Sequence, residues 1–288
     1  MTDGELFESY NLANVKLTKY EWVISPFWFF QFVKPKFIDF IKRLPGTPTL
    51  RDKEHYGKMI ADEIFVNTLL YKFRAILIEE GYCNLQPIDK FSHLVEIGLL
   101  ELYDLNLITC EGVLTPLPEG IILQLIGERE FVRIDNSNIQ RMMSLRAGRP
   151  ELQPLLTYIV ENLLTLLSNT LYKQVRRRSD LPLLNFNRHI WAHLSSIDPT
   201  YHRDNCLRMV HILDSLLAIN AIIKDDFIRI KHIIFETFFN GKNKLVGNRE
   251  KYYEETVRNG LSNLNLRRVE LLKKHPYFKE GFYFRKSA

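Results

Sequence analysis

Residues 152–178 read LQPLLTYIVENLLTLLSNTLYKQVRRR, and this stretch decides the fold class. Its apolar residues, among them Leu155, Ile159 and Leu163, fall on almost every side of a helix instead of forming one stripe. A helix of this kind belongs at the centre of a bundle. The stretch ends in Lys173 and three consecutive arginines, where cations interact favourably with the C-terminal end of a helix dipole. The sequence therefore predicts a long central helix.

The rest of the chain is predicted to be helical as well. Apolar residues repeat with a period near that of an α-helix and are bounded by capping and breaking residues. Ser25-Pro26, for example, places a serine at an N-cap and a proline at the first helical position. On these signals, helices are expected over residues 25–44, 51–82, 88–103, 186–195, 202–223, 226–239 and 250–274. The predicted fold class is all-α, a helical bundle with a helical N-terminal region.

One short stretch of the N-terminal region favours β-structure. Residues 107–115 read LITCEGVLT, with two apolar runs around Glu111-Gly112, and predict one small β-hairpin. A helix pair followed by a hairpin is also typical of the wing of a winged-helix DNA-binding protein. Because no convincing basic recognition helix precedes the hairpin, a connecting hairpin is the preferred interpretation.

Proline and glycine residues divide the chain into regions. Pro45-Gly46-Thr47-Pro48 separates two predicted helices, and Gly148-Arg149-Pro150 is the preferred domain boundary. We therefore expect a helical N-terminal region over residues 1–148, a helical bundle over 149–240, and a basic helical tail over 241–288. The first region is large enough to have a sensing or regulatory role.

Composition places the chain among ordinary globular proteins. Charged residues make up 25% and hydrophobic residues 46%, which argues against disordered and fibrous classes. A formal net charge of +5 permits an acidic partner such as RNA without requiring one. The cysteines Cys83, Cys110 and Cys206 are odd in number and form no CxxC pair. Neither a disulfide framework nor a cysteine-built zinc site is therefore expected.

The same signals predict a cytoplasmic protein with no membrane partner. Residues 1–8 carry acidic side chains where a secretory signal would carry basic ones. Residues 22–33 form the most lipid-like run, but a membrane-spanning helix needs roughly 20 apolar residues. We expect the aromatic side chains of this run in the core or in a subunit contact. Docking on a membrane surface or on a partner is the alternative.

A break in the apolar pattern marks the candidate site. Residues 185–193 read NFNRHIWAH and lie between two predicted apolar helices. In a helical bundle, such a break is typical of functional residues. The segment contains Asn187, Arg188 and His189, followed by a second histidine, His193.

This motif resembles that of the HEPN superfamily, whose hallmark is an arginine followed four to six residues later by a histidine. The resemblance covers roughly residues 151–223, about a quarter of the chain, with an apolar helix before the motif and an amphipathic helix after it. Asn205 lies near the start of the second helix. Leu194 departs from the pattern, because many relatives have glycine there, and this leaves the backbone turn after the motif open. The arginine-to-histidine spacing alone has low specificity.

The resemblance implies a metal-independent ribonuclease in which the motifs of two subunits face each other in one site, without a cofactor. The 2′-hydroxyl of RNA can attack the adjacent phosphate if a proton acceptor, a proton donor and a cation are supplied. His193 is expected to be the general base or acid, and Arg188 to clamp the phosphate and the transition state. Asn187 would orient the substrate or hold the arginine. His189 would be the partner acid or a structural neighbour.

Family context also implies partners and a role. RNA is the expected substrate, with tRNA among the candidates, and the expected assembly is a homodimer. A toxin, abortive-infection or anti-phage role is expected, with an antitoxin or another regulatory protein restraining the enzyme. Lys173, Arg176, Arg177 and Arg178 would extend the RNA-binding surface. A solvated charge cluster at a helix end is the equally weighted alternative for these four residues.

Two other classes of protein stay open. His189 and His193 are four residues apart, as in helical zinc sites, but no glutamate lies between them as in HExxH. A third ligand would have to come from Asp198, His202 or a more distant residue. A non-catalytic dimerisation or RNA-binding scaffold is the other alternative, with the motif residues acting as a cap or a buried polar network. The sequence has no P-loop, dinucleotide-binding glycine pattern or GxSxG motif.

Overall fold

The structure is a computed structural model that describes residues 2–128, 136–173, 186–187, 202–240, 248–256 and 258. These residues are predominantly helical and include no strand, which confirms the predicted all-α class. The first α-helices are α1 (Asp3–Thr18), α2 (Pro26–Phe32), α3 (Pro35–Arg43), α4 (Leu50–Thr68), α5 (Tyr71–Ile76), α6 (Ser92–Tyr103), α7 (Leu107–Leu114) and α8 (Leu117–Leu125). They are followed by α9 (Asn136–Met143), α10 (Gln153–Asn169), α12 (His202–Ile223) and α13 (Phe227–Asn240). Shorter helices are η1 (Leu77–Tyr82, a π-helix), η2 (Ile88–Phe91) and η3 (Pro150–Leu152), and residues 248–256 are helical too.

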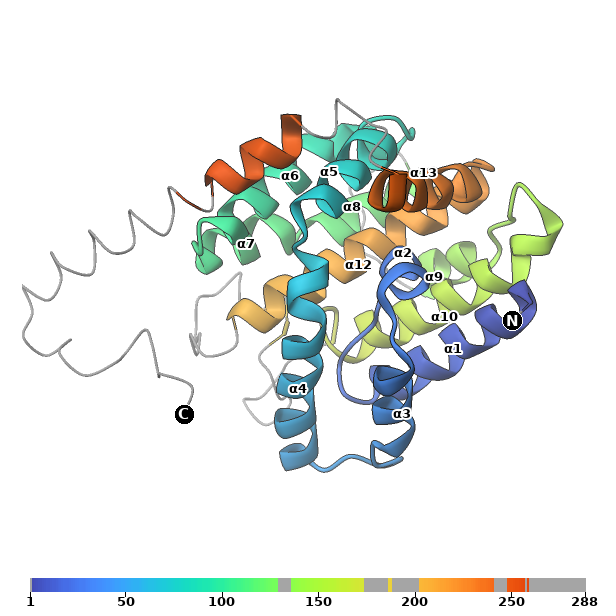
Figure 1. The fold of residues 1–288 in the computed structure, drawn as a ribbon. Coiled ribbons are helices and arrows are strands. Elements are labelled where there is room, and N and C mark those ends of the chain that lie inside the picture. Colours follow the sequence, from blue (N-terminus) through green and yellow to red (C-terminus); the bar gives the residue numbers. More distant parts are fainter. Residues whose placement is uncertain are drawn as a thin grey trace, which may run out of the picture.

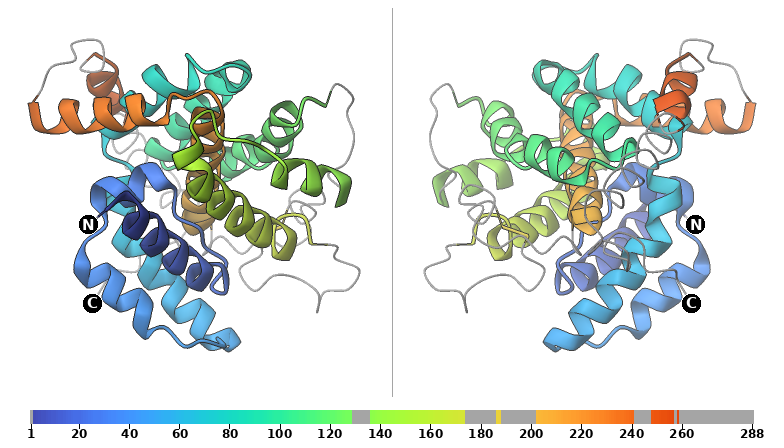
Figure 2. Two further views of the ribbon diagram at one scale, coloured as in Figure 1. Left: turned by 90° about the vertical axis from the view of Figure 1, so that its right-hand side faces the viewer. Right: turned by 90° about the vertical axis from the view of Figure 1, so that its left-hand side faces the viewer.

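α12 is the central helix of the fold (Figures 1 and 2). It packs against α2, α4, α7, α8 and α10, and nearly all of its residues are buried. Its bounds match the predicted helix over residues 202–223. Within the described part of the chain, α12 is the one helix long and apolar enough to cross a membrane, and 94% of its most apolar window is buried in the fold. Its position in the core accounts for its apolar composition.

The helix expected over residues 152–178 is shorter than predicted. α10 packs between α1 and α12 and ends at Asn169, because Thr170 leaves the helical conformation with φ −127° and ψ −87°. The Thr170 hydroxyl donates to the carbonyl of Leu166 at 2.7 Å and so bonds the last turn. Residues 174–178 lie outside the described residues.

The predicted helix over residues 25–44 is two helices. Its start is confirmed, since the Ser25 hydroxyl accepts the N–H of Trp28 at 3.3 Å and Pro26 is the first residue of α2. α2 ends at Phe32, and both Val33 (φ −64°, ψ 125°) and Lys34 (φ −100°, ψ 148°) are extended. Lys34 precedes a proline, and such a residue is driven out of the helical region. Pro35 then begins α3. The aromatic residues of α2 are core residues, with Phe27, Trp28 and Phe29 each 1% exposed.

The predicted helix over residues 51–82 is also interrupted. Leu70 is extended (φ −57°, ψ 117°) and separates α4 from α5. At this break the Thr68 hydroxyl is bonded to His211, and the Leu69 carbonyl accepts from the Tyr103 hydroxyl at 3.2 Å. The break is thus accompanied by bonds to residues distant in sequence. Because the apolar period continues across Leu70, the sequence gives no sign of the break.

The β-hairpin prediction over residues 107–115 is wrong. This stretch is the helix α7, which packs against α6 and α12. Cys110, Glu111 and Leu114 are buried, a spacing of one and four residues that only a helix can turn toward one neighbour. Tertiary packing therefore overrides the local preference for strand. The winged-helix alternative loses its wing with the hairpin.

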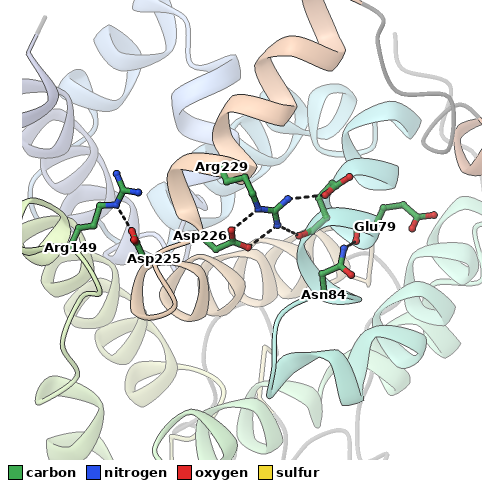
Figure 3. Close-up of polar contacts among 7 residues, drawn as sticks. Glu79, Asn84, Arg149, Asp225, Asp226 and Arg229 are labelled. Carbon is green, nitrogen blue, oxygen red and sulfur yellow. Dashed lines mark hydrogen bonds and ion pairs between the residues drawn. The ribbon is translucent and has the colours of Figure 1, made fainter.

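Three ion pairs join the turn between α12 and α13 to neighbouring parts of the chain and to α13 itself (Figure 3). Arg149 pairs with Asp225, and Arg229 pairs with Asp226 and with Glu80 of η1 at 2.9 Å. Helices from both sides of the predicted boundary at 148/149 contribute to one buried apolar cluster around α12. The division of the chain into functional regions stays a prediction.

Gly148 allows the chain to approach this turn closely. Its N–H donates to the carbonyl of Ile222 at 2.9 Å. A Cβ at this position would lie 2.9 Å from the Cβ of Asp225 and 3.0 Å from its backbone nitrogen. The glycine noted as a boundary signal in the sequence is therefore required for packing against the end of α12.

Candidate functional site

The structure describes two of the predicted site residues, Asn187 and Lys173. Arg188, His189, His193 and the arginines Arg176, Arg177 and Arg178 lie outside the described residues. Lys173 is exposed at the end of the turn that follows α10, and its role in RNA binding stays a prediction.

Asn187 is buried, with 1% of its surface exposed. Its Nδ2 donates to the carbonyl of Thr170 at 2.7 Å and to the carbonyl of Lys173 at 3.0 Å. Both acceptors follow the last turn of α10, where backbone carbonyls lack intrahelical partners. The asparagine that opens the motif therefore fixes the beginning of the motif to the C-terminal end of α10.

Phe186 fixes the same point to α12. It is 1% exposed, and the guanidinium of Arg208 lies 5.8 Å from the centre of its ring. The same guanidinium lies 4.3 Å from the ring of Trp22. A buried cation interacts favourably with aromatic faces, particularly where water is absent. The start of the motif is thus attached to both helices that flank it in sequence.

Arg208 belongs to a buried polar group at the N-terminal half of α12. His202 Nδ1 lies 2.7 Å from Glu111 Oε2, and Asn205 Nδ2 donates to Glu111 Oε1 at 3.0 Å. Arg208 Nη1 donates to Asn205 Oδ1 at 2.8 Å, and its Nε donates to the carbonyl of Glu21 at 2.9 Å. Burial lowers the pKa of Arg208, and the charges of Asp204, Glu21 and Glu111 oppose that shift. An arginine keeps its charge in proteins, so this group is an ionic network inside the core.

A second buried group lies further along α12. Asp214 forms an ion pair with Arg74 of α5, with Nη1 and Oδ2 2.8 Å apart, and accepts the Tyr82 hydroxyl at 3.0 Å. The Arg74 and Asp214 side chains are each 1% exposed. Burial raises the pKa of Asp214 despite the opposing charge of Arg74 and the hydrogen bonds. Desolvation therefore outweighs the attraction between the two charges at this site.

The polar residues of α12 follow one ridge of the helix. His202, Asn205, Arg208, His211 and Asp214 recur at every third position, and each is buried. We call these five residues the polar ridge. Their partners come from α7, the α1–α2 connection, α4 and α5. The ridge therefore sets how the N-terminal helices dock on α12, and its period of three is visible in the sequence.

His211 is held in its neutral form. Its Nδ1 accepts the N–H of Ser25 at 3.2 Å, which leaves the proton on Nε2, 2.9 Å from the Thr68 hydroxyl. Burial, with the nearby charge of Arg74, lowers the pKa of His211 from 6.5 to about 3. In the unfolded chain the imidazole takes up a proton below its ordinary pKa, and in the folded chain it does not. Stability from this group is therefore full above about pH 6.5 and falls as the pH drops toward 3.

We expect acidification from pH 7 to pH 5 to lower the free energy of unfolding by roughly 2 kcal/mol through His211. Urea unfolding at both pH values measures it. His211→Asn keeps an acceptor for Ser25 but cannot titrate. The free energy of unfolding of this variant should therefore fall by roughly 2 kcal/mol less than that of the wild type between pH 7 and pH 5. His93→Asn, at an exposed position, is the matched control and should behave like the wild type. Equal pH dependence in the wild type and His211→Asn would contradict the assignment.

The buried cysteine of α12 is poorly suited to nucleophilic chemistry. Cys206 lies in α12, and burial together with the neighbouring Cys110 raises the pKa of its thiol well above the ordinary value. A protonated, buried thiol is a weak nucleophile. Within the described ranges, no three histidine, cysteine or acidic side chains are grouped so that they could hold a metal ion.

Comparisons of the chain with protein-family models, curated proteins and solved structures found no match.

Proposed function

We propose that the protein is a metal-independent RNA endonuclease of the HEPN type, acting as a homodimer. The observation that carries the proposal is the attachment of Phe186 and Asn187. Asn187 bonds the end of α10 and Phe186 packs on Arg208 of α12. The resemblance requires one helix before the motif and one after it. In the structure these are α10 and α12, and they contact Asn187 and Phe186, respectively. This is the placement expected if Arg188, His189 and His193 act from one fixed point.

The proposed chemistry is attack of the RNA 2′-hydroxyl on the adjacent phosphate, with loss of the 5′-oxygen of the next nucleotide. His193 moves the proton as general base or acid, because an imidazole titrates near neutral pH. Arg188 neutralises charge on the phosphate in the transition state. Asn187 is a positioning residue in this scheme, because its Nδ2 bonds two backbone carbonyls. His189 is the second proton carrier or a neighbour of the site.

The proposed setting is intracellular. RNA is the substrate, with tRNA as one candidate, and a second copy of the chain completes the site. A toxin, abortive-infection or anti-phage role agrees with this chemistry, because cleavage of cellular RNA stops growth. An antitoxin or another regulatory protein would restrain the enzyme, and residues 1–148 would take part in sensing.

Cleavage of RNA by the purified protein in EDTA tests the proposal. Arg188→Ala and His193→Ala are each expected to lower the rate about 100-fold or more, as loss of a general acid–base or of a transition-state cation does. Products of the wild type should end in 2′,3′-cyclic phosphates. Arg146→Ala, at an exposed arginine of the connection before η3, is the matched control and should cleave normally. Equal rates in the wild type and both motif variants would refute the proposal.

A non-catalytic scaffold is the second candidate, and the polar ridge favours it. Arg208, His211 and Asp214 are buried and bonded to other helices, so the polar residues of this bundle have structural partners. If the motif continues this pattern, Arg188 and His193 would be structural as well. A folded dimer that cleaves neither total RNA nor tRNA, and whose motif variants lose thermal stability, would support the scaffold.

A further inference from the structure

Positive charge is concentrated in one part of the N-terminal region. Residues 14–58 carry nine lysines and arginines against four carboxylates, a net charge equal to the +5 of the whole chain. Residues 173–178 and the C-terminal region from residue 241 are also basic. In the fold, residues 14–58 comprise the end of α1, all of α2 and α3, and the start of α4, and α1, α3 and α4 lie together on one side of α12 (Figures 1 and 2).

Direct contacts join the end of α1 to the connection between α3 and α4. Lys16 Nζ donates to the carbonyl of Lys42 at 3.0 Å, and Lys19 Nζ donates to the carbonyl of Gly46 at 2.9 Å. The Tyr20 hydroxyl donates to the carbonyl of Pro45 at 2.9 Å, so the end of α1 follows the α3–α4 connection. We call six cations of this region the basic surface: Lys16 and Lys19 at the end of α1, Lys42 and Arg43 at the end of α3, and Arg51 and Lys58 in the first half of α4.

The carboxylates of this region do little to neutralise the basic surface. Among the described residues, no carboxylate forms an ion pair with any of its six cations. Glu21 is 5% exposed and is paired with Lys53 at 3.1 Å. Asp52 accepts the N–H and hydroxyl of Thr49 in a capping box, which lowers the pKa of its carboxyl, and the charge of Arg51 lowers that pKa further. Asp39 of α3 and Glu54 of α4 are the two exposed carboxylates, and Glu54 lies between Arg51 and Lys58 in sequence.

The position of Arg51 is unfavourable for folding alone. Cations at the end of α3 interact favourably with its dipole, which gives Lys42 and Arg43 a structural explanation. Arg51 instead lies in the first turn of α4, where the dipole repels a cation, and no described carboxylate forms an ion pair with it. Arg51 and Lys58 are also seven residues apart and so share one exposed face of α4. Unpaired cations from three elements on one surface are typical of phosphate binding.

The basic surface is connected to the start of the motif. Glu21 follows the basic end of α1, its carboxylate pairs with Lys53, and its carbonyl accepts from Arg208. The guanidinium of Arg208 in turn packs on Phe186. Two residues, Glu21 and Arg208, thus separate Lys53 of α4 from Phe186, and Lys53 lies between Arg51 and Lys58 of the basic surface in sequence.

We propose that the basic surface binds the phosphate backbone of the RNA that the motif cleaves. The inference rests on the proposed function for the identity of the strand, but its cations, their exposure and their connection to the motif are independent of cleavage. The contacts of Glu21 with Lys53 and with Arg208, and of Arg208 with Phe186, place α4 close to the point at which the motif is attached. The contacts with RNA are to phosphates, so the basic surface contributes affinity and orientation and not sequence preference.

Binding of a fluorescent 2′-O-methyl RNA, which lacks the attacking hydroxyl, tests the surface without cleavage. Lys19→Gln/Lys42→Gln/Arg51→Gln removes one cation from each element. We expect Kd to rise about tenfold and the slope of log Kd against log salt to fall by about 2, as three lost phosphate contacts to a single strand predict. Lys90→Gln/Lys224→Gln/Arg146→Gln removes the same charge from other exposed positions and should change both quantities little.

Four outcomes are decisive. Weaker binding in the first variant alone supports the surface, and with cleavable RNA it should appear as a higher KM at unchanged kcat. If the wild type binds RNA but cleaves none, and the first variant binds more weakly, the surface is supported and the proposed nuclease is refuted. Equal loss in both triple variants would overturn the surface, because net charge alone would then explain binding. Binding of phosphatidylserine vesicles but not of RNA would also overturn it, in favour of a membrane.

Discussion

Asp214→Ala is expected to lower the free energy of unfolding by about 3–5 kcal/mol, one of the two largest effects we expect from a single substitution in this chain. The variant leaves the guanidinium of Arg74 buried, 1% exposed, without its counter-ion. Arg74 Nε and Nη2 have no hydrogen-bond partner among the described residues even in the wild type. The Tyr82 hydroxyl loses its acceptor as well. Urea unfolding at pH 7 measures the change.

The control is removal of both charges. Burial raises the pKa of Asp214 despite Arg74, so the pair contributes little net stability against two apolar residues. Arg74→Met/Asp214→Leu should therefore be more stable than Asp214→Ala by at least about 2 kcal/mol. If the double variant is as unstable as Asp214→Ala, the cost lies in packing and the account of an uncompensated charge is wrong.

The sequence predicted the parts of the fold that depend on apolar period. The bounds of α12 were predicted correctly, and the start of α2 followed from Ser25 and Pro26. Errors occurred where a tertiary contact decides the outcome. Residues 107–115 favour strand locally but are helical, because Cys110, Glu111 and Leu114 are buried against neighbouring helices. The break at Leu70 has no local signal, because it depends on bonds to His211 and Tyr103.

The candidate site was predicted from its residues and not from its surroundings. Asn187 was chosen for its place in the motif, but its bonds to the carbonyls of Thr170 and Lys173 could not be read from the sequence. Such bonds depend on where α10 ends, and α10 ends nine residues before the predicted position. The polar ridge was overlooked, although polar residues at every third position of an apolar helix are a visible signal. Which partners the ridge would find could not be inferred, because Glu21, Arg74 and Glu111 are distant in sequence.

The second large effect is expected at Glu111, the acceptor for two members of the polar ridge. Glu111→Ala leaves His202 Nδ1 and Asn205 Nδ2 without the carboxylate oxygens that lie 2.7 and 3.0 Å away. Each buried polar group without a partner costs about 1–3 kcal/mol, so we expect the free energy of unfolding to fall by about 3 kcal/mol. Arg208 also loses one of the charges that offset its burial.

The loss at Glu111 should extend to the motif, because Asn205 holds Arg208 and Arg208 packs on Phe186. Hydrogen exchange of the Phe186 and Asn187 amides should therefore be faster in Glu111→Ala than in the wild type under conditions where both are folded. Glu63→Ala, at an exposed glutamate of α4, is the control and should change stability by less than about 0.5 kcal/mol and leave that exchange unchanged. A destabilised Glu111→Ala with unchanged exchange at these two amides would show that the network supports α7 and α12 but does not hold the motif.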